Sequence, residues 1–200
     1  NNNNSFIFKQ ILFLLKLILV NLIISKNIRI LLNYKSEIKI VIQGNGIQNI
    51  LSTYYSEILP SEVLVNGVKD STCSKTCNLK GDKNNVTLVF ANPFASLREL
   101  FRKLNNIIEA DLSNFDSSIL NDMIRIFYDC SNLRKINFGN MDTSKVTNMR
   151  SLFKGCFSLT SLNLTNFITS NNTSLFQWFS GCSNLKYIDL SNFDTSKVEN

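Results

Sequence analysis

Histidine is absent from all 200 residues of this chain. It is the commonest general base and the commonest metal ligand in proteins, so its absence excludes a hydrolase built on a Ser–His or Cys–His pair. A zinc site would also need more ligands than a pair of cysteines supplies. We therefore expect no histidine-dependent hydrolase, no cofactor and no metal.

Acidic residues are missing from one end of the chain. The formal net charge is +6, but the first 36 residues carry five basic side chains and no acid, which leaves the remainder with a net charge of only +1. No basic patch remains to bind a phosphate backbone, so we expect no nucleic-acid partner. The five basic residues are Lys9, Lys16, Lys26, Arg29 and Lys35.

Residues 1–26 contain the apolar run "ILFLLKLILVNLII". A cationic residue, Lys9, followed by this run is typical of a secretory signal peptide. A signal anchor is the alternative, although Lys16 would then lie near mid-membrane at a cost of ~3 kcal/mol; a buried helix is a third. Either leading interpretation predicts a secreted or cell-surface protein, with membrane contact only through this segment or a C-terminal anchor.

The chain from residue 100 onward repeats every 26 residues. Four rows agree column by column, and they begin at Leu100, Ile126, Leu152 and Trp178; the last row is cut short at Asn200. A fixed period of this length indicates stacked units that bury their apolar faces against one another. We call the four rows repeat units 1 to 4.

Each unit carries two apolar periodicities. In unit 2, Ile136 and Phe138 alternate as in a strand with one face buried. Val146 and Met149, continued by Leu152 of unit 3, follow three-residue steps that are typical of a short helix, which Gly155 would end. The expected fold class is therefore α/β, a solenoid with a parallel sheet and short helical segments.

An asparagine follows the predicted strand in every unit. Its side chain can bond to loop backbone in its own and in adjacent units, which predicts a stacked asparagine ladder. The ladder comprises Asn114, Asn140, Asn166 and Asn192.

The stretches "LKYIDLSNFDTSKVEN" and "INFGNMDTSKVTNMRSLFKGCFSLTSLNLTNF" resemble the BspA-like leucine-rich repeats of bacterial and protist surface proteins. The resemblance covers residues 94–200 and implies a leucine-rich-repeat solenoid on a secreted or surface-anchored protein, with roles in adhesion or recognition and no catalytic residues. Unit 1 has Leu104 where the later units have cysteine, and unit 3 has Ile168 in an aspartate column.

Residues 37–92 precede the repeats and differ in pattern. The stretches "EIKIVIQG", "SEVLVNGV" and "NNVTLVF" alternate as strands and are separated by turn signals. We expect a small β-rich N-terminal cap over the open end of unit 1. The predicted organisation is a signal segment at residues 1–26, this cap at residues 37–92, and a C-terminally truncated repeat array at residues 94–200.

The five cysteines divide into two groups. Cys73 and Cys77 are close enough in sequence for a local disulfide, which an exported chain favours. Equivalent side chains of stacked units point the same way, which disfavours disulfides between them, so the other cysteines are expected to be buried free thiols. These are Cys130, Cys156 and Cys182.

The outward positions of the predicted strands form a candidate recognition face. They are Glu109, Asp111, Lys135, Asn137, Ser161, Asn163, Tyr187 and Asp189. They either bind a partner or are simply hydrated. Sequons for N-glycosylation occur at Asn85, Asn163, Asn171 and Asn172.

The sequence thus predicts a secreted or cell-surface leucine-rich-repeat protein that recognises a protein or glycan ligand at the cell exterior. Two alternatives remain open. One is a structural spacer of a surface coat, and the other is an accessory extracellular region of a receptor or enzyme whose remaining domains lie beyond residue 200.

Overall fold

The computed structural model describes residues 35–172 and 174–199. The predicted signal segment at residues 1–26 lies outside them. Within the described residues the regular secondary structure consists of strands, and no helix is present. No segment of this part forms a helix long and apolar enough to cross a membrane. The predicted α/β solenoid with short helical segments is therefore wrong: the described chain is all-β, with mixed parallel and antiparallel sheets.

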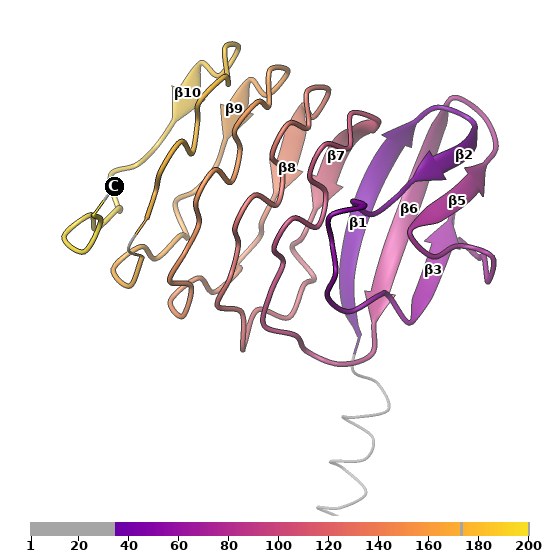
Figure 1. Cartoon of the computed structure of the whole chain (residues 1–200), viewed down its shortest axis with the longest axis horizontal. Helices are drawn as coiled ribbons and strands as arrows, with labels where there is room; N and C mark the ends of the chain where they lie inside the picture. The colour runs from indigo at the N-terminus through magenta and orange to yellow at the C-terminus, as the bar shows by residue number, and fades with distance from the viewer. Residues whose placement is uncertain (1–34, 173, 200) are drawn as a thin grey trace, which may run out of the picture. The chain divides into compact units, whose positions relative to one another are not determined.

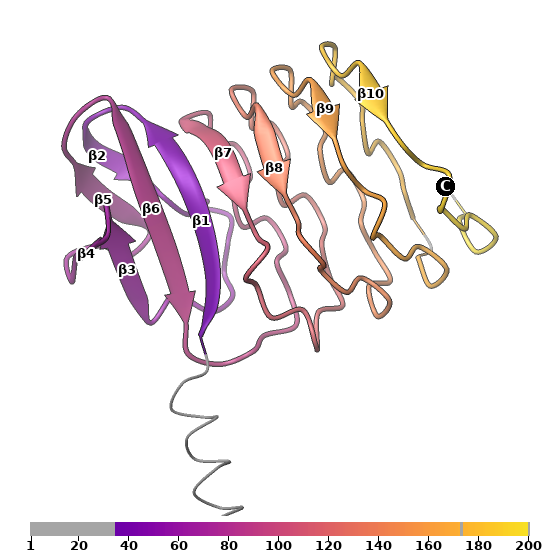
Figure 2. The ribbon, with the colours of Figure 1, turned by 180° about the vertical axis from the view of Figure 1, so that it is seen from behind.

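The largest sheet has six strands in the order β4-β3-β6-β1-β7-β8 (Figures 1 and 2). The cap contributes four of these strands and the repeat units contribute two. Their bounds are β1 Ser36–Gln43, β3 Glu62–Val65, β4 Val68–Lys69, β6 Lys83–Phe90, β7 Ile107–Asp111 and β8 Lys135–Asn137.

Two smaller sheets complete the strands. In the cap, β2 (Gly46–Asn49) pairs antiparallel with β5 (Thr76–Leu79). In the later units, β9 (Ser161–Leu162) pairs in parallel with β10 (Tyr187–Ile188). Figures 1 and 2 show β7, β8, β9 and β10 side by side in chain order, one from each repeat unit.

The cap is joined to the repeats by its first strand. β1 alternates buried isoleucines with outward side chains, as expected for a strand with one face in the core. It pairs antiparallel with β6 on one side and with β7 on the other, and Lys39 lies opposite Asp111. The cap therefore extends the sheet of the repeat units.

The segments expected to be helical form backbone ladders between units. In the first three of these segments, alternate N–H groups donate to carbonyls 25 residues further along the chain, and N–H groups between them close tight turns within a segment. The first segment donates from Leu97 to Asp122, from Glu99 to Ile124, from Phe101 to Ile126 and from Lys103 to Tyr128, over 2.7–3.0 Å. We call these segments, at residues 96–104, 122–130, 148–156 and 174–182, the turn segments.

Backbone conformation explains why no helix forms there. Each turn segment has two residues with positive φ, four positions apart, and a right-handed helix cannot continue through such residues. These residues are Glu99 and Lys103, Arg125 and Asp129, Ser151 and Gly155, and Gln177 and Gly181. Gly155, which was predicted to end a helix, instead occupies a left-handed position inside a turn segment. The three- and four-residue apolar spacing reflects this four-residue turn.

One phenylalanine from each turn segment stacks on the next in the core. The ring centroids of Phe101, Phe127, Phe153 and Phe179 are separated in turn by 5.6, 6.2 and 5.7 Å. Offset or parallel stacking at this spacing adds to the free energy of burial. The column continues through all four turn segments and aligns neighbouring units.

The repeated cysteines bond to this column. Each thiol approaches the carbonyl of the phenylalanine 29 residues earlier: Cys130 to Phe101 at 2.9 Å, Cys156 to Phe127 at 3.1 Å, and Cys182 to Phe153 at 3.0 Å. Cysteine is small and apolar, yet it supplies a weak S–H donor to a buried carbonyl. Cys130 and Cys156 are buried free thiols, whereas Cys182 is partly exposed.

We predict that alanine at Gly155 destabilises the fold more than alanine at Gly181. Both glycines have positive φ, which costs alanine about 1–2 kcal/mol. A Cβ at Gly155 would also lie 3.2 Å from the Asp129 Cα and still closer to its carboxylate, whereas at Gly181 the nearest atom is 3.4 Å away. Crowding should add about 1–3 kcal/mol to the loss for Gly155→Ala. Urea unfolding of both variants measures the difference, and equal losses would contradict the crowding.

Thiol labelling should distinguish the three repeated cysteines. Burial raises the pKa of Cys130 to about 12 and raises the pKa of Cys156 further, so both remain protonated and unreactive at pH 8. Burial also raises the pKa of Cys182, but this thiol is partly exposed and the reagent can reach it, so Cys182 should react first. Mass spectrometry after a short pulse of maleimide identifies the labelled residue. Rapid native labelling of Cys130 would contradict the described core.

Candidate recognition face

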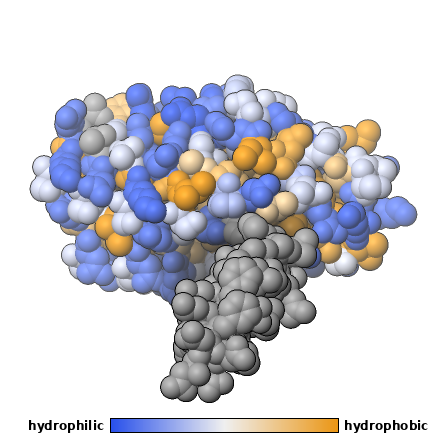
Figure 3. Space-filling model, turned by 90° about the horizontal axis from the view of Figure 1, so that it is seen from below, coloured by the Kyte–Doolittle hydropathy of each residue, from blue (hydrophilic) through white to orange (hydrophobic). Residues whose placement is uncertain are grey.

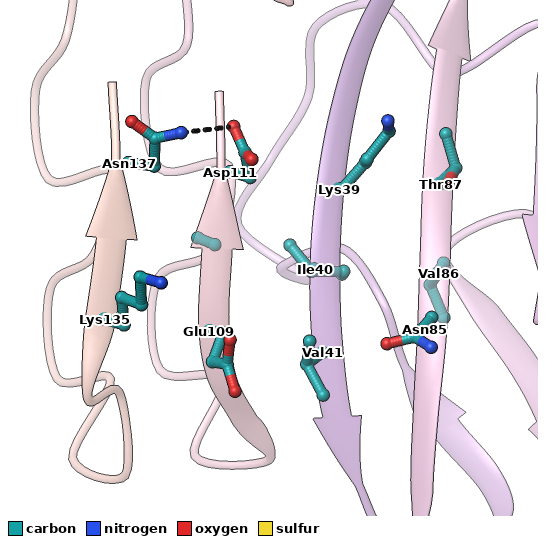
Figure 4. Close-up of a pocket in the computed structure, with 11 residues that line it drawn as sticks. Lys39, Ile40, Val41, Asn85, Val86, Thr87, Glu109, Asp111, Lys135 and Asn137 are labelled. Carbon is teal, nitrogen blue, oxygen red and sulfur yellow. Dashed lines mark hydrogen bonds between the residues drawn. The ribbon is translucent and has the colours of Figure 1, made fainter. Parts of the chain in front are cut away.

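The outward side chains of four neighbouring strands lie on one surface (Figure 4). Strand register places them in two rows across β6, β1, β7 and β8. One row contains Thr87, Lys39, Asp111 and Asn137, and the other contains Asn85, Val41, Glu109 and Lys135. We call the two rows, with their continuation at Ser161, Asn163, Tyr187 and Asp189 in units 3 and 4, the outer face.

All eight predicted face residues lie on this outer face. Their strand neighbours explain the orientation, because Ala110 and Ile136 point into the core between them. In units 3 and 4, Tyr187 lies opposite Ser161 in the parallel register of β9 and β10. The pairing thus brings together side chains that are 26 or more residues apart in sequence.

Four face residues from the cap were missed by the sequence analysis: Lys39, Val41, Asn85 and Thr87. The alternation in "EIKIVIQG" and "NNVTLVF" does put these positions on one side of their strands. What the sequence does not reveal is that β1 pairs with β7, about 70 residues later. Without that pairing, the cap and the repeats seem to present separate surfaces.

A column of side chains at the carboxyl ends of the strands is fixed by its own backbone. In each unit a side-chain Oδ1 accepts a hydrogen bond from the N–H two residues later, at 2.9–3.0 Å. The pairs are Asp111 with Ser113, Asn137 with Gly139, Asn163 with Thr165, and Asp189 with Ser191. This turn holds each side chain in one orientation, and in unit 2 the Asn137 NH₂ group also donates to the Asp111 Oδ1 of unit 1 at 3.2 Å.

These hydrogen bonds favour the charged form of the aspartates. At Asp111, partial burial opposes ionisation, but hydrogen bonds from Ser113 and Asn137, together with the charge of Lys39, outweigh it and lower the pKa. At Asp189, the hydrogen bonds from Ser191 lower the pKa. Both carboxylates are therefore ionised at neutral pH, and they present fixed negative charge on the outer face.

A shallow hollow of about 280 Å³ lies where the cap meets unit 1. Its lining combines two lysines, Lys39 and Lys135, with two carboxylates, Glu109 and Asp111, and includes the outward side chain of Val41. Lys83 reaches Glu109 at 3.5 Å and Lys39 reaches Glu37 at 3.8 Å, both of them exposed pairs that water can readily replace. The hollow therefore offers charges of both signs to a partner.

The predicted asparagine ladder lies beside the face. Asn166 donates to the Gly139 carbonyl at 3.1 Å and to the Asn140 side-chain oxygen at 3.2 Å, and Asn192 donates to the Thr165 carbonyl at 3.1 Å. At the cap end, the Asn114 carbonyl accepts the Glu37 N–H. These bonds join neighbouring units and serve the backbone.

The remaining predicted sites are distributed over the chain. Cys73 and Cys77 are joined by a disulfide in the cap, which ties Cys77 of β5 to the loop that precedes this strand. Of the sequon asparagines, Asn85 and Asn163 lie on the outer face and Asn171 is exposed, whereas Asn172 is buried and accepts the Ser174 N–H. A glycan on Asn85 or Asn163 would cover part of the outer face.

Elsewhere the described surface is mixed in polarity. On the side viewed in Figure 3, hydrophobic residues lie in small groups among hydrophilic ones. Among the described residues, no three His, Cys, Asp or Glu side chains are close enough to hold a metal ion.

We predict that Asp111→Ala destabilises the protein by about 1 kcal/mol, because the Ser113 N–H loses its acceptor, whereas Asp111→Asn retains the turn. The wild type should exceed Asp111→Asn in stability at neutral pH, because the lowered pKa makes the carboxylate stabilising above its unfolded value of ~3.9. That advantage should vanish as the pH falls through the lower folded-state pKa. Unfolding curves from pH 7 to 2 measure it, and a constant difference would contradict the prediction.

The comparisons with known proteins place the repeats in one family. Residues 95–200 match the model described as "Mycoplasma protein of unknown function, DUF285". No curated protein matches the chain, and no solved structure does. The matched residues make up more than half of the 200, and they include all eight outer-face residues that come from the repeat units. The chain therefore belongs to the DUF285 family.

Proposed function

We propose that this chain is a non-enzymatic recognition protein at the cell exterior, and that it binds a protein or glycan ligand through its outer face. The observation that carries the proposal is the continuity of this face. Strand pairing connects polar side chains of the cap to those of units 1 and 2, and the register shift between β1 and β7 begins only after Val41, the last residue of β1 in the two rows of the outer face. A ligand can therefore contact several units at once, which distributes the affinity over many weak contacts.

Fixed side-chain orientation supports a binding role. The backbone bonds at Asp111, Asn137, Asn163 and Asp189 hold these groups before a ligand arrives. Preorganised groups lose little conformational entropy on binding, so more of the interaction energy appears as affinity. A spacer of a surface coat would need only hydrated side chains in this place.

The proposed location rests on separate evidence. The disulfide between Cys73 and Cys77 is of the kind that persists in oxidising compartments. The apolar run of residues 1–26 has the composition of an export signal. Both features favour a secreted or cell-surface protein.

Charge reversal in the hollow should weaken binding. We predict that the double variant Lys39→Glu/Lys135→Glu loses at least about tenfold in affinity, because two cations beside Glu109 and Asp111 become anions and create like-charge repulsion. The full chain is immobilised, and saturable binding is measured against an extracellular-matrix extract and against an array of neutral and acidic glycans.

A matched control separates this effect from net charge. Lys80→Glu/Lys197→Glu makes the same charge change at exposed lysines outside the hollow, and it should bind as the wild type does. Equal affinity of all three proteins would refute a role for the hollow. An absence of saturable binding by the wild type to either probe would favour the spacer alternative.

A further inference from the structure

Tyr187 is the most exposed aromatic side chain of the outer face. It is 75% exposed, although the neighbouring strand residues Leu162 and Ile188 pack inward. A large, rigid ring that is exposed to water contributes no free energy of burial to the fold, and exposed apolar groups of this kind often mark a binding site. Tyr187 lies outside the stacked phenylalanine column of the core, so packing in the core does not explain its presence.

Most of the groups around Tyr187 are polar. They line a shallow surface hollow formed by β9, β10 and the turns that follow them, and they comprise Ser161, Asn163, Thr165, Lys186 and Asp189, together with the apolar Leu162 and Ile188. The hollow is open, so a ligand can approach along the row of units. One cation and one anion flank the ring, which gives the hollow no net charge.

Two of these groups have a defined hydrogen-bonding role. The Asn163 Oδ1 accepts from the Thr165 N–H at 3.0 Å and from the Thr165 hydroxyl at 2.8 Å, so its NH₂ group points away from that turn. The Asp189 Oδ1 accepts from the Ser191 N–H at 2.9 Å, which leaves Oδ2 as an acceptor. A fixed donor on one unit and a fixed acceptor on the next flank an exposed ring.

We propose that this hollow is a subsite for a neutral pyranose residue of a glycan, with Tyr187 as the stacking platform and with Asn163 and Asp189 bonding the sugar hydroxyls. A pyranose ring has an apolar C–H face that covers an aromatic ring, and hydroxyls at its edge that need both donors and acceptors. The assignment rests on the proposed recognition function and narrows its ligand class at this end of the outer face.

A side chain of a protein partner fits these surroundings less well. Hot spots in protein interfaces are aromatic or arginine side chains in well-packed pockets from which neighbouring contacts exclude water. Tyr187 instead lies in an open hollow rimmed by hydroxyl, amide and carboxylate groups. Such a mixture of one apolar platform and a few placed polar groups is typical of small-ligand sites.

Saturation-transfer NMR on the full chain tests the subsite. The probes are tetrasaccharides of β-linked glucose, β-linked N-acetylglucosamine and α-linked mannose. At least one should receive magnetisation at its ring C–H protons. Tyr187→Ala should abolish this transfer and Tyr187→Phe should retain it, because phenylalanine keeps the stacking surface. Phe157→Ala removes another exposed aromatic outside the hollow and should have no effect.

Two further variants separate binding from structure. Asn163→Asp keeps the oxygen that accepts from Thr165 but removes the NH₂ donor, and Asp189→Asn keeps the bond from Ser191 but removes the charge. Each variant should bind the tetrasaccharide that responds in the NMR experiment at least about fivefold more weakly than the wild type does. The melting temperature of the protein should not change. Equal binding by these variants would overturn the assignment of the two groups.

The outcome is distinguishable from that of the proposed function. If no tetrasaccharide binds, or if binding survives Tyr187→Ala, the subsite is refuted. Saturable binding of the wild type to the matrix extract that depends on Lys39 and Lys135 would then still uphold the recognition function with a protein ligand. If the wild type binds neither a tetrasaccharide nor the matrix extract, both proposals are refuted.

Discussion

The structure of the repeats depends on backbone hydrogen bonds between units. Every second N–H of a turn segment donates to the following unit, and this is possible only because φ becomes positive every four residues. A helix would have satisfied the same groups internally, and on this side of the units only side chains would then have joined one unit to the next. The stacked phenylalanines and the bonded thiols lie directly behind these ladders and depend on the register that the ladders set.

The cap pairs with the first unit, whose backbone ladders would otherwise end in unpaired N–H and C=O groups. On the strand side β1 pairs with β7, and on the turn side Ser52 donates to the Leu100 carbonyl, the equivalent of the Ile126 carbonyl in the next unit. Tyr54 of the cap also contacts unit 1, with the Arg102 guanidinium 3.9 Å from the centre of its ring. Two separate stretches of the cap thus replace one missing unit, which protects the sheet edge and unit 1.

The same pairing that closes the first unit creates the outer face. Because β1 and β6 continue the sheet, Lys39 and Asn85 join the polar rows of the repeats. The face begins with mixed charges at the cap and ends with an exposed tyrosine in unit 4, so its two ends suit different chemical groups. A recognition function and a sugar subsite are consistent with this gradient, and each has its own test.

The sequence by itself determined the 26-residue period and, within the repeat units, the positions of the strands and of their eight outward residues, because alternation is a local pattern and the period is visible when the rows are aligned. It did not predict β2 and β5 of the cap. The prediction of helices in the turn segments was wrong, because apolar spacing at three and four residues suits both a helix and a tight turn. Only the backbone hydrogen bonds to the next unit decide between them. The four cap residues of the outer face also required the tertiary structure. Their place follows from the pairing of β1 with β7, a long-range contact that no local pattern encodes.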